Sequence, residues 1–164
     1  MPLRRISLLS LVLLATLGAC ARPHVSTGPR FAGLDGASVY VRSDLPDAFA
    51  GGRELRVGQL RSRVVAQLER ARVPVRSGEG GEAGMALEIS GMRISDDDYA
   101  VWVRVSLAEL VSFERGSGLP LMVDTWVRTG KARVRGADTA ELWREIDRLV
   151  AEFAREYHAA NPPR

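Results

Sequence analysis

The stretch YAVWVRVSLAELVSF, residues 99–113, decides the fold, because apolar and polar residues alternate along almost its whole length. Such alternation is typical of a β-strand that buries one face in a core. The residues expected on the buried face are Val101, Val103, Val105, Leu107, Val111 and Phe113, and Glu109 is the one charged residue among them. At about 3.3 Å per residue the strand would be about 50 Å long, so we expect a bend or bulge near Glu109.

Two more strands are expected beside this one. The strand before it contains Leu87, Ile89, Met92 and Ile94, and its alternation changes phase at Gly91, where we expect a bulge. The acidic run 96–98 predicts the turn between the two. After a loop at 115–118, Leu121, Val123 and Val127 predict a further strand that runs to about Val134.

Helical spacing appears on both sides of this block of strands. Apolar residues recur every three to four positions over 57–71, which predicts a helix that ends before Pro74. Gly58 costs about 1 kcal/mol relative to alanine, so the helix is expected to be firm from about Gln59. A second apolar stripe follows Asp138, which with Glu141 forms a capping-box arrangement, and ends at Asn161 and Pro162.

The order of these elements predicts the architecture. Alternation at 39–42 adds a short strand before the first helix, which gives the order β-α-β-β-β-α. Two helices with one apolar face each are best buried on the same face of a sheet. We therefore expect an α+β domain over residues 37–162, a two-layer sandwich of a four-stranded, mainly antiparallel sheet with both helices on one face.

The first residues predict export from the cytoplasm. Arg4 and Arg5 precede an apolar run from Ile6 to Leu17, which is too short to span a bilayer and is typical of a signal peptide over residues 1–19. The alternative is an ordinary secretory signal cut after Ala19. The single cysteine, Cys20, favours the lipoprotein pathway, because a lone free thiol is a liability in an oxidising compartment.

Residues 20–36 are rich in Pro, Gly, Ser and Thr and predict a tether between a lipidated Cys20 and the domain. Without residues 1–19 the chain has 21 basic and 20 acidic residues, because Arg4 and Arg5 are removed. This near-neutral balance gives no electrostatic reason to expect a nucleic-acid partner.

No arrangement of residues predicts catalysis, a metal site or a cofactor. His24 lies in the expected tether and His158 at the end of the last helix, and the acidic run 96–98 lacks the closing glutamate of a calcium loop. Glu109 is either a buried functional carboxylate or a glutamate at a bulge. If Phe113 pairs with Leu121, Thr125 lies opposite Glu109 and could donate a hydrogen bond to it.

The other face of the strand pair 99–113 and 121–134 is the expected interaction surface. If both strands are regular, it carries Trp102, Arg104, Leu110, Met122, Trp126 and Arg128. Tryptophan, methionine and arginine are enriched at protein interfaces. We expect Trp102, Arg104, Trp126 and Arg128 to contact a partner; the alternative is that the tryptophans pack against the tether or a loop.

Two residue patterns and the order of the elements resemble known families. Leu17-Gly18-Ala19-Cys20 resembles a lipobox, which implies acylation of Cys20, and Ala21 after it implies sorting to the outer membrane in the enterobacterial rule. Asp124-Thr125-Trp126, with the spacing Phe153, Tyr157 and Ala160-Asn161-Pro162, is similar to a group of small uncharacterised bacterial exported lipoproteins. In element order the domain also resembles the lipopolysaccharide-assembly lipoprotein and the amino-terminal domain of TolB, which assist envelope machinery.

The sequence therefore predicts a non-enzymatic lipoprotein of the cell envelope. It would be held in the outer membrane, or in the inner membrane, through its lipid, face the periplasm, and bind an envelope protein or glycolipid through its sheet face or edge strand. One alternative is a periplasmic carrier of a lipid or small hydrophobic ligand between sheet and helices. A hydrolase is the other alternative.

Overall fold

The computed structural model describes residues 31–45, 49, 55–76, 83–111 and 120–162. The expected sites at Cys20 and His24, and Phe113, lie outside these residues. The elements are β1 (Ser38–Asp44), α1 (Val57–Arg70), β2 (Ala83–Ser95), β3 (Asp98–Val111), β4 (Leu121–Arg135) and α2 (Ala140–Ala160). The predicted element order is therefore confirmed.

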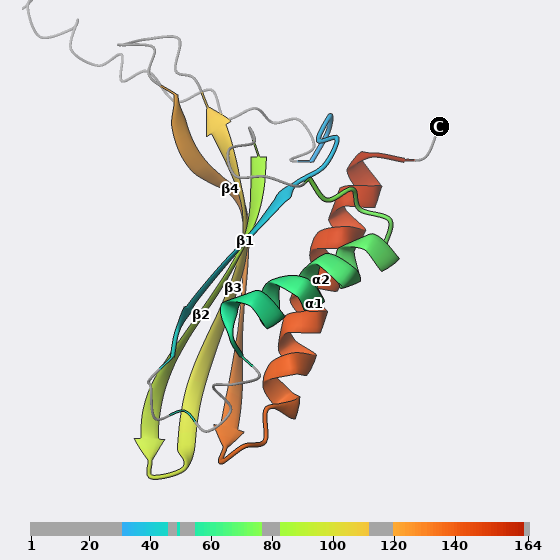
Figure 1. Ribbon diagram of the computed structural model, residues 1–164. Helices are drawn as coiled ribbons and strands as arrows, with labels where there is room; N and C mark the ends of the chain where they lie inside the picture. Colours follow the sequence, from blue (N-terminus) through green and yellow to red (C-terminus); the bar gives the residue numbers. More distant parts are fainter. Residues whose placement is uncertain (1–30, 46–48, 50–54, 77–82, 112–119, 163–164) are drawn as a thin grey trace, which may run out of the picture.

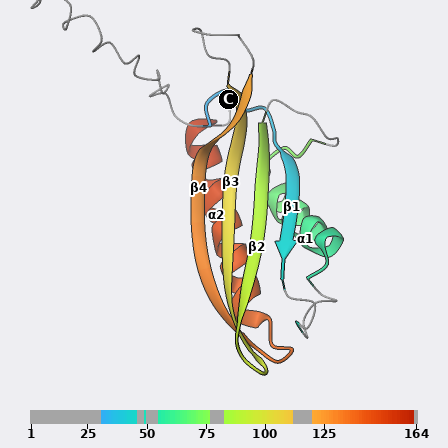
Figure 2. The same ribbon diagram turned by 90° about the vertical axis from the view of Figure 1, so that its left-hand side faces the viewer.

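The four strands form one sheet in the order β1-β2-β3-β4. β1 and β2 are parallel, because α1 carries the chain back between them, whereas β2, β3 and β4 pair antiparallel through consecutive hairpins. Both helices lie on one face of this sheet, and the opposite face is open (Figures 1 and 2). The predicted α+β two-layer sandwich is confirmed.

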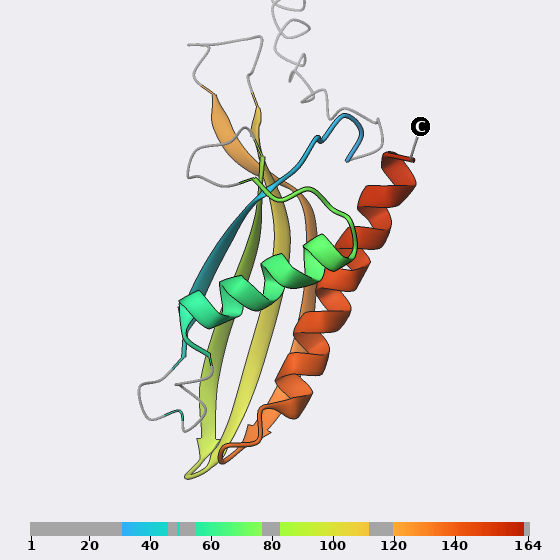
Figure 3. The ribbon, with the colours of Figure 1, turned by 45° about the vertical axis from the view of Figure 1, so that its right-hand side comes forward.

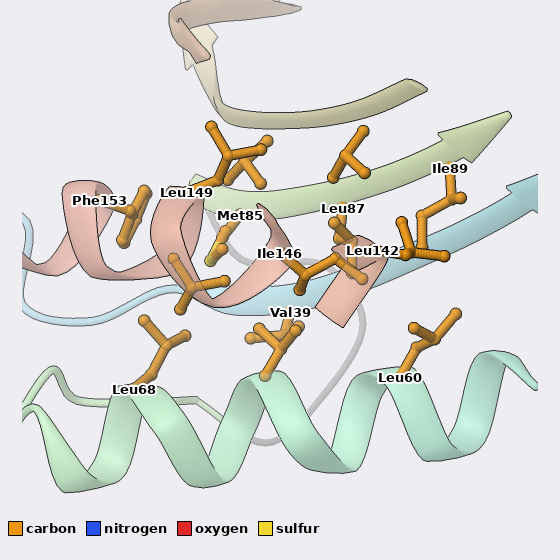
Figure 4. Packing of buried hydrophobic residues seen from close by; sticks show 14 of the residues in the cluster. Val39, Leu60, Leu68, Met85, Leu87, Ile89, Leu142, Ile146, Leu149 and Phe153 are labelled. Carbon is orange, nitrogen blue, oxygen red and sulfur yellow. The ribbon is translucent and has the colours of Figure 1, made fainter. Parts of the chain in front are cut away.

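The core lies between the sheet and the two helices. Strand residues Val39, Met85, Leu87 and Ile89 face Leu60 and Leu68 of α1 and the stripe of α2, and all are buried (Figure 4). The stripe of α2 consists of Leu142, Ile146, Leu149, Val150, Phe153 and Tyr157. At about 1.5 to 3 kcal/mol for each fully buried large apolar side chain, this stripe is a major source of stability.

Polar contacts fix the two helices against each other, as they cross over the sheet (Figure 3). Arg63 of α1 forms an ion pair with Asp147 of α2 at 2.7 Å, and its guanidinium lies 4.1 Å from the centre of the Trp143 ring. Gln67 donates a hydrogen bond of 2.8 Å to the carbonyl oxygen of Asp147.

The domain begins before residue 37, so the expected tether boundary at residue 36 is wrong. Phe31 is buried and packs edge-on against Trp126 and Phe153, with ring centres 5.9 and 5.1 Å apart. Asn161, at the end of α2, donates a hydrogen bond of 2.7 Å to the carbonyl oxygen of Phe31 and accepts one of 3.2 Å from the amide of Gly33. The Pro- and Gly-rich composition around residue 31 predicted a tether, although Phe31 is part of the core.

The bulge expected at Gly91 is not present, because Gly91 pairs directly with Val101. The register of the β2–β3 pair shifts instead between Arg93 and Ser95. Met92 and Ile94 are exposed, so the change of phase in the sequence marks apolar residues on the open face. The bend or bulge expected near Glu109 is present as a register shift of the β3–β4 pair between Leu107 and Ala108, with the extra residue on β4.

Candidate functional site

The open face of the sheet is the candidate interaction surface. Its ladder runs across the three long strands, and among the described residues no helix covers it (Figure 2). The residues placed there by the strand register include Glu88, Ser90, Met92, Trp102, Arg104, Asp124, Lys131 and Arg133. We call this set the open face.

A row of ion pairs crosses the middle of the open face. Arg104 of β3 donates hydrogen bonds to Glu88 of β2 at 2.7 Å and to Asp124 of β4 at 2.5 Å. These two hydrogen bonds raise the pKa of the Arg104 guanidinium above its ordinary value, and the bond to Glu88 has the larger effect. The row links β2, β3 and β4, and each of its three charged side chains has an ion-pair partner within the protein.

Trp102 lies next to this row. Its neighbours across the ladder are Ser90 on β2 and Lys131 on β4, and 39% of the residue is exposed. Met92 and Ile94 continue the apolar surface toward the β2–β3 turn. An indole beside a lysine and exposed apolar side chains provides an anchor of the kind found at binding hot spots.

An ion pair between Asp98 and Arg133 lies at the end of the open face next to the β2–β3 turn. Arg133 Nε lies 2.8 Å from Asp98 Oδ1 and 3.0 Å from Oδ2, and its Nη2 also donates to Oδ2. The Arg133 hydrogen bonds hold the pKa of the Asp98 carboxyl below its usual value. Asp98 therefore belongs to β3, rather than to the acidic turn in which the sequence placed it.

A depression lies at the same end of the sheet. Its volume is about 460 Å³, and its lining residues are Ile94, Ala100, Lys131, Ala132, Arg133 and Glu141. It adjoins the open face through Lys131 and Arg133. The strand pattern did not reveal it, because its wall includes Glu141 from the first turn of α2.

Trp126 does not lie on the open face, so this part of the predicted surface is wrong. It is 1% exposed and packs edge-on against both Phe31 and Phe153 on the side of the helices. Its Nε1 donates a hydrogen bond of 2.8 Å to Glu156 of α2. The alternative that a tryptophan packs against the expected tether is thus confirmed for Trp126 through Phe31.

Arg128 also faces α2, where it binds two carboxylates. Its Nη2 lies 2.8 Å from Glu156 Oε1, its Nε lies 3.8 Å from Glu152 Oε2, and its guanidinium lies 5.2 Å from the centre of the Trp126 ring. The four residues expected to share a surface are therefore divided: Trp102 and Arg104 lie on the open face, while Trp126 and Arg128 join β4 to α2.

One extra residue in β4 explains this division. Leu107 pairs with Trp126 but Ala108 pairs with Asp124, so Thr125 has no partner in the ladder. A bulge of this kind reverses the alternation along the strand. Beyond the bulge, Glu109 lies opposite Val123 and not Thr125, whose hydroxyl donates to the Leu107 carbonyl oxygen at 3.3 Å. The expected Thr125–Glu109 pairing is therefore wrong.

The candidates for metal or acid–base chemistry remain dispersed. His158 Nε2 lies 2.6 Å from the carbonyl oxygen of Ala71, where it joins the end of α2 to the end of α1. Within the part of the chain that the structure describes, no three His, Cys, Asp or Glu side chains are grouped to hold a metal ion. Nor does any helix in that part combine the length and apolar character needed to cross a membrane.

Comparison with known proteins finds few similarities. No family model matches the sequence, and no curated protein matches it. Among solved structures, a minor lipoprotein from Acinetobacter baumannii is 12% identical with a TM-score of 0.30, over 76% of this chain and 94% of that one. Rare lipoprotein B from Shewanella oneidensis is 12% identical with a TM-score of 0.20, over 76% and 88% of the two chains. Similarity this low assigns no function to the chain.

Proposed function

We propose that this protein is a lipoprotein of the cell envelope, acylated on Cys20, that binds another envelope component through the open face of its sheet. The partner is an envelope protein or a glycolipid, and the protein performs no catalysis. The lipobox Leu17–Cys20 after a short apolar run supports the anchor. Ala21 after the cysteine favours the outer membrane facing the periplasm over the inner membrane.

The exposure of Trp102 on an uncovered sheet is the observation that carries the binding proposal. A sheet with one bare face normally carries polar residues on that face. Here an indole lies between the ion-paired row of Arg104 and the exposed Met92 and Ile94. Buried aromatic anchors surrounded by polar residues supply most of the energy of many interfaces.

The packing of the core argues against the carrier alternative. Val103, Val105 and Leu107 have no exposed surface, and neither do Leu60, Leu142 and Leu149 on the helices. No space large enough for a water molecule therefore lies against these side chains, and a ligand between sheet and helices would have to separate the two layers.

Metabolic labelling tests the anchor. Cells given radiolabelled palmitate should label the wild-type protein and not the Cys20→Ser variant, because the cysteine thiol accepts the diacylglycerol. Inhibition of the lipoprotein signal peptidase should make the unprocessed precursor accumulate. Label that persists in the Cys20→Ser protein would contradict lipidation at this residue.

Photocrosslinking tests the surface. A photoreactive amino acid at position 102 should give discrete adducts in intact cells, and the same amino acid at Arg61, on the exposed side of α1, serves as the control. Adducts from position 102 alone support binding through the open face. Identical adducts from both positions, or none from position 102, would place the binding surface elsewhere.

A further inference from the structure

The described ends of β3 and β4, next to residues 112–119, extend past the rest of the sheet (Figures 1 and 3). The pairing of β2 with β3 stops at Ala83 and Glu109 among the described residues. Beyond it, Leu110 pairs with Met122 and Val111 with Leu121. In the described part of the chain, this end of the sheet is therefore a ribbon of two strands.

Apolar side chains occupy both faces of this ribbon. Leu110 and Met122 lie on the same face as Arg104 and are 45% and 52% exposed. Leu121 and Val123 lie on the opposite face, and they are 54% and 39% exposed. We call these four residues the hairpin patch. Exposed apolar clusters are found at protein–protein and membrane interaction sites.

The hairpin patch lies at the end of the domain where the chain enters it. The blue segment where the described chain begins, the ribbon and the end of α2 are all at the same end of the molecule in every view (Figures 1, 2 and 3), and Phe31 is hydrogen-bonded to Asn161 at the end of α2. Between Cys20 and Phe31 the chain has eleven residue steps, which span at most about 36 to 40 Å. The β2–β3 turn lies one strand length farther away, about 45 Å.

We propose that the hairpin patch docks into the interfacial layer of the membrane that holds the acyl chains of Cys20. This proposal rests on the lipidation proposed above. The short tether keeps the patch at a high effective concentration beside the lipid, so that a small apolar contact is sufficient.

Charge indicates that the contact is apolar. Residues 108–111 and 120–124 contain no lysine or arginine, and their two acids are Glu109 and Asp124. Asp124 is already bound to Arg104. Docking should therefore not require anionic lipid and should persist at high salt concentration.

The test couples the protein to vesicles through its only cysteine. The chain from Cys20 onward keeps every contact described here, and its Cys20 thiol reacts with a maleimide lipid in zwitterionic phosphatidylcholine vesicles. Hydrogen–deuterium exchange then compares the coupled protein with the free protein. We expect slower exchange at residues 108–111 and 121–124 in the coupled protein, and unchanged exchange at the β2–β3 turn.

Two double variants separate docking from general adhesion. Leu121→Ser with Met122→Ser removes half of the hairpin patch and should abolish the added protection. Met92→Ser with Ile94→Ser removes side chains that are 58% and 55% exposed near the far end of the same sheet, and should retain it. Unchanged melting temperatures of both variants establish that they fold.

The outcomes are distinct. Equal exchange in coupled and free wild-type protein, equal protection in both double variants, or loss of protection at high salt would each overturn the proposal. Protection that appears without vesicles as protein concentration rises would assign the patch to a second copy of the chain and would also overturn it. The vesicle experiment attaches Cys20 to the lipid chemically, so its result does not depend on acylation in cells. Failure of palmitate labelling in cells would therefore count against the lipid anchor alone, and failure of protection on vesicles against the docking of the hairpin patch alone.

Discussion

At the scale of single residues, the two tryptophans of the hairpin have opposite roles. Trp126 is enclosed by Phe31 and Phe153 and bonded to Glu156, whereas Trp102 lies on the open face. Trp126→Ala should lower the free energy of unfolding by about 3 to 5 kcal/mol, because it creates a large cavity. Trp102→Ala should cost less than about 1 kcal/mol, the range of cross-strand contacts. Urea denaturation measures both, and equal losses would contradict the assignment.

The Asp98 carboxyl should make the free energy of unfolding depend on pH in the acidic range. Its pKa is lowered by Arg133, and the charge of Arg135 acts in the same direction. A carboxyl whose folded pKa lies below its unfolded value of about 3.9 stabilises the fold above that pH, and this contribution is lost as the pH falls through the folded pKa.

The Asp98→Asn variant should therefore be less stable than the wild type at neutral pH, and the difference should shrink below about pH 4. Thermal unfolding at several pH values, at constant salt, measures it. Asp97→Asn, in the adjacent turn, is the control that should follow the wild type. A difference between wild type and Asp98→Asn that is constant down to pH 2 would show that the ion pair contributes nothing.

At the scale of the elements, the bulge at Thr125 determines which way β4 faces. Deleting Thr125 should leave Trp126 in the core and Asp124 on the open face, because the remaining residues then alternate regularly. We expect a loss of about 1 kcal/mol, for the hydrogen bond to Leu107. Deleting Val127 instead should reverse Trp126 to the open face and destabilise far more. Equal losses in urea denaturation would contradict this register.

The sequence predicted each element but not how the strands pair. Alternation and helical spacing are local properties, so β3, α1 and α2 could be located from the chain alone. The faces of β4 depend on its register with β3, and nothing in Asp124-Thr125-Trp126 distinguishes a bulge from a regular strand. Phe31 was missed for a related reason, since an isolated aromatic residue in a Pro- and Gly-rich segment has no period to indicate burial.

The same limit applies to the candidate site. Trp102 and Arg104 were correctly placed on the uncovered face, because β3 is regular up to Leu107. The partners of Arg104, Glu88 and Asp124, come from two other strands and could only be found once the register was known.

At the scale of the whole molecule, α2 closes the domain. Leu142, Ile146, Leu149, Val150 and Phe153 on this helix have no exposed surface. Truncation after Ala137 should leave the sheet without half of its cover and give an unfolded or degraded product. Removal of residues 163–164 alone is the control and should leave the melting temperature unchanged. A soluble, cooperatively unfolding product that ends at Ala137 would show that α2 is dispensable.

The packing of Phe31 also gives the domain a defined response to force. A pull on the chain before residue 31 acts on the Phe31 carbonyl held by Asn161 and on the ring between Trp126 and Phe153. From there it passes to β1, which starts at the same end and runs along β2 (Figure 1). The hydrogen bonds of that parallel pair are spaced along the pulling direction, so they share the load in shear instead of opening one at a time. A protein held between a lipid and a partner on its sheet would resist being pulled apart.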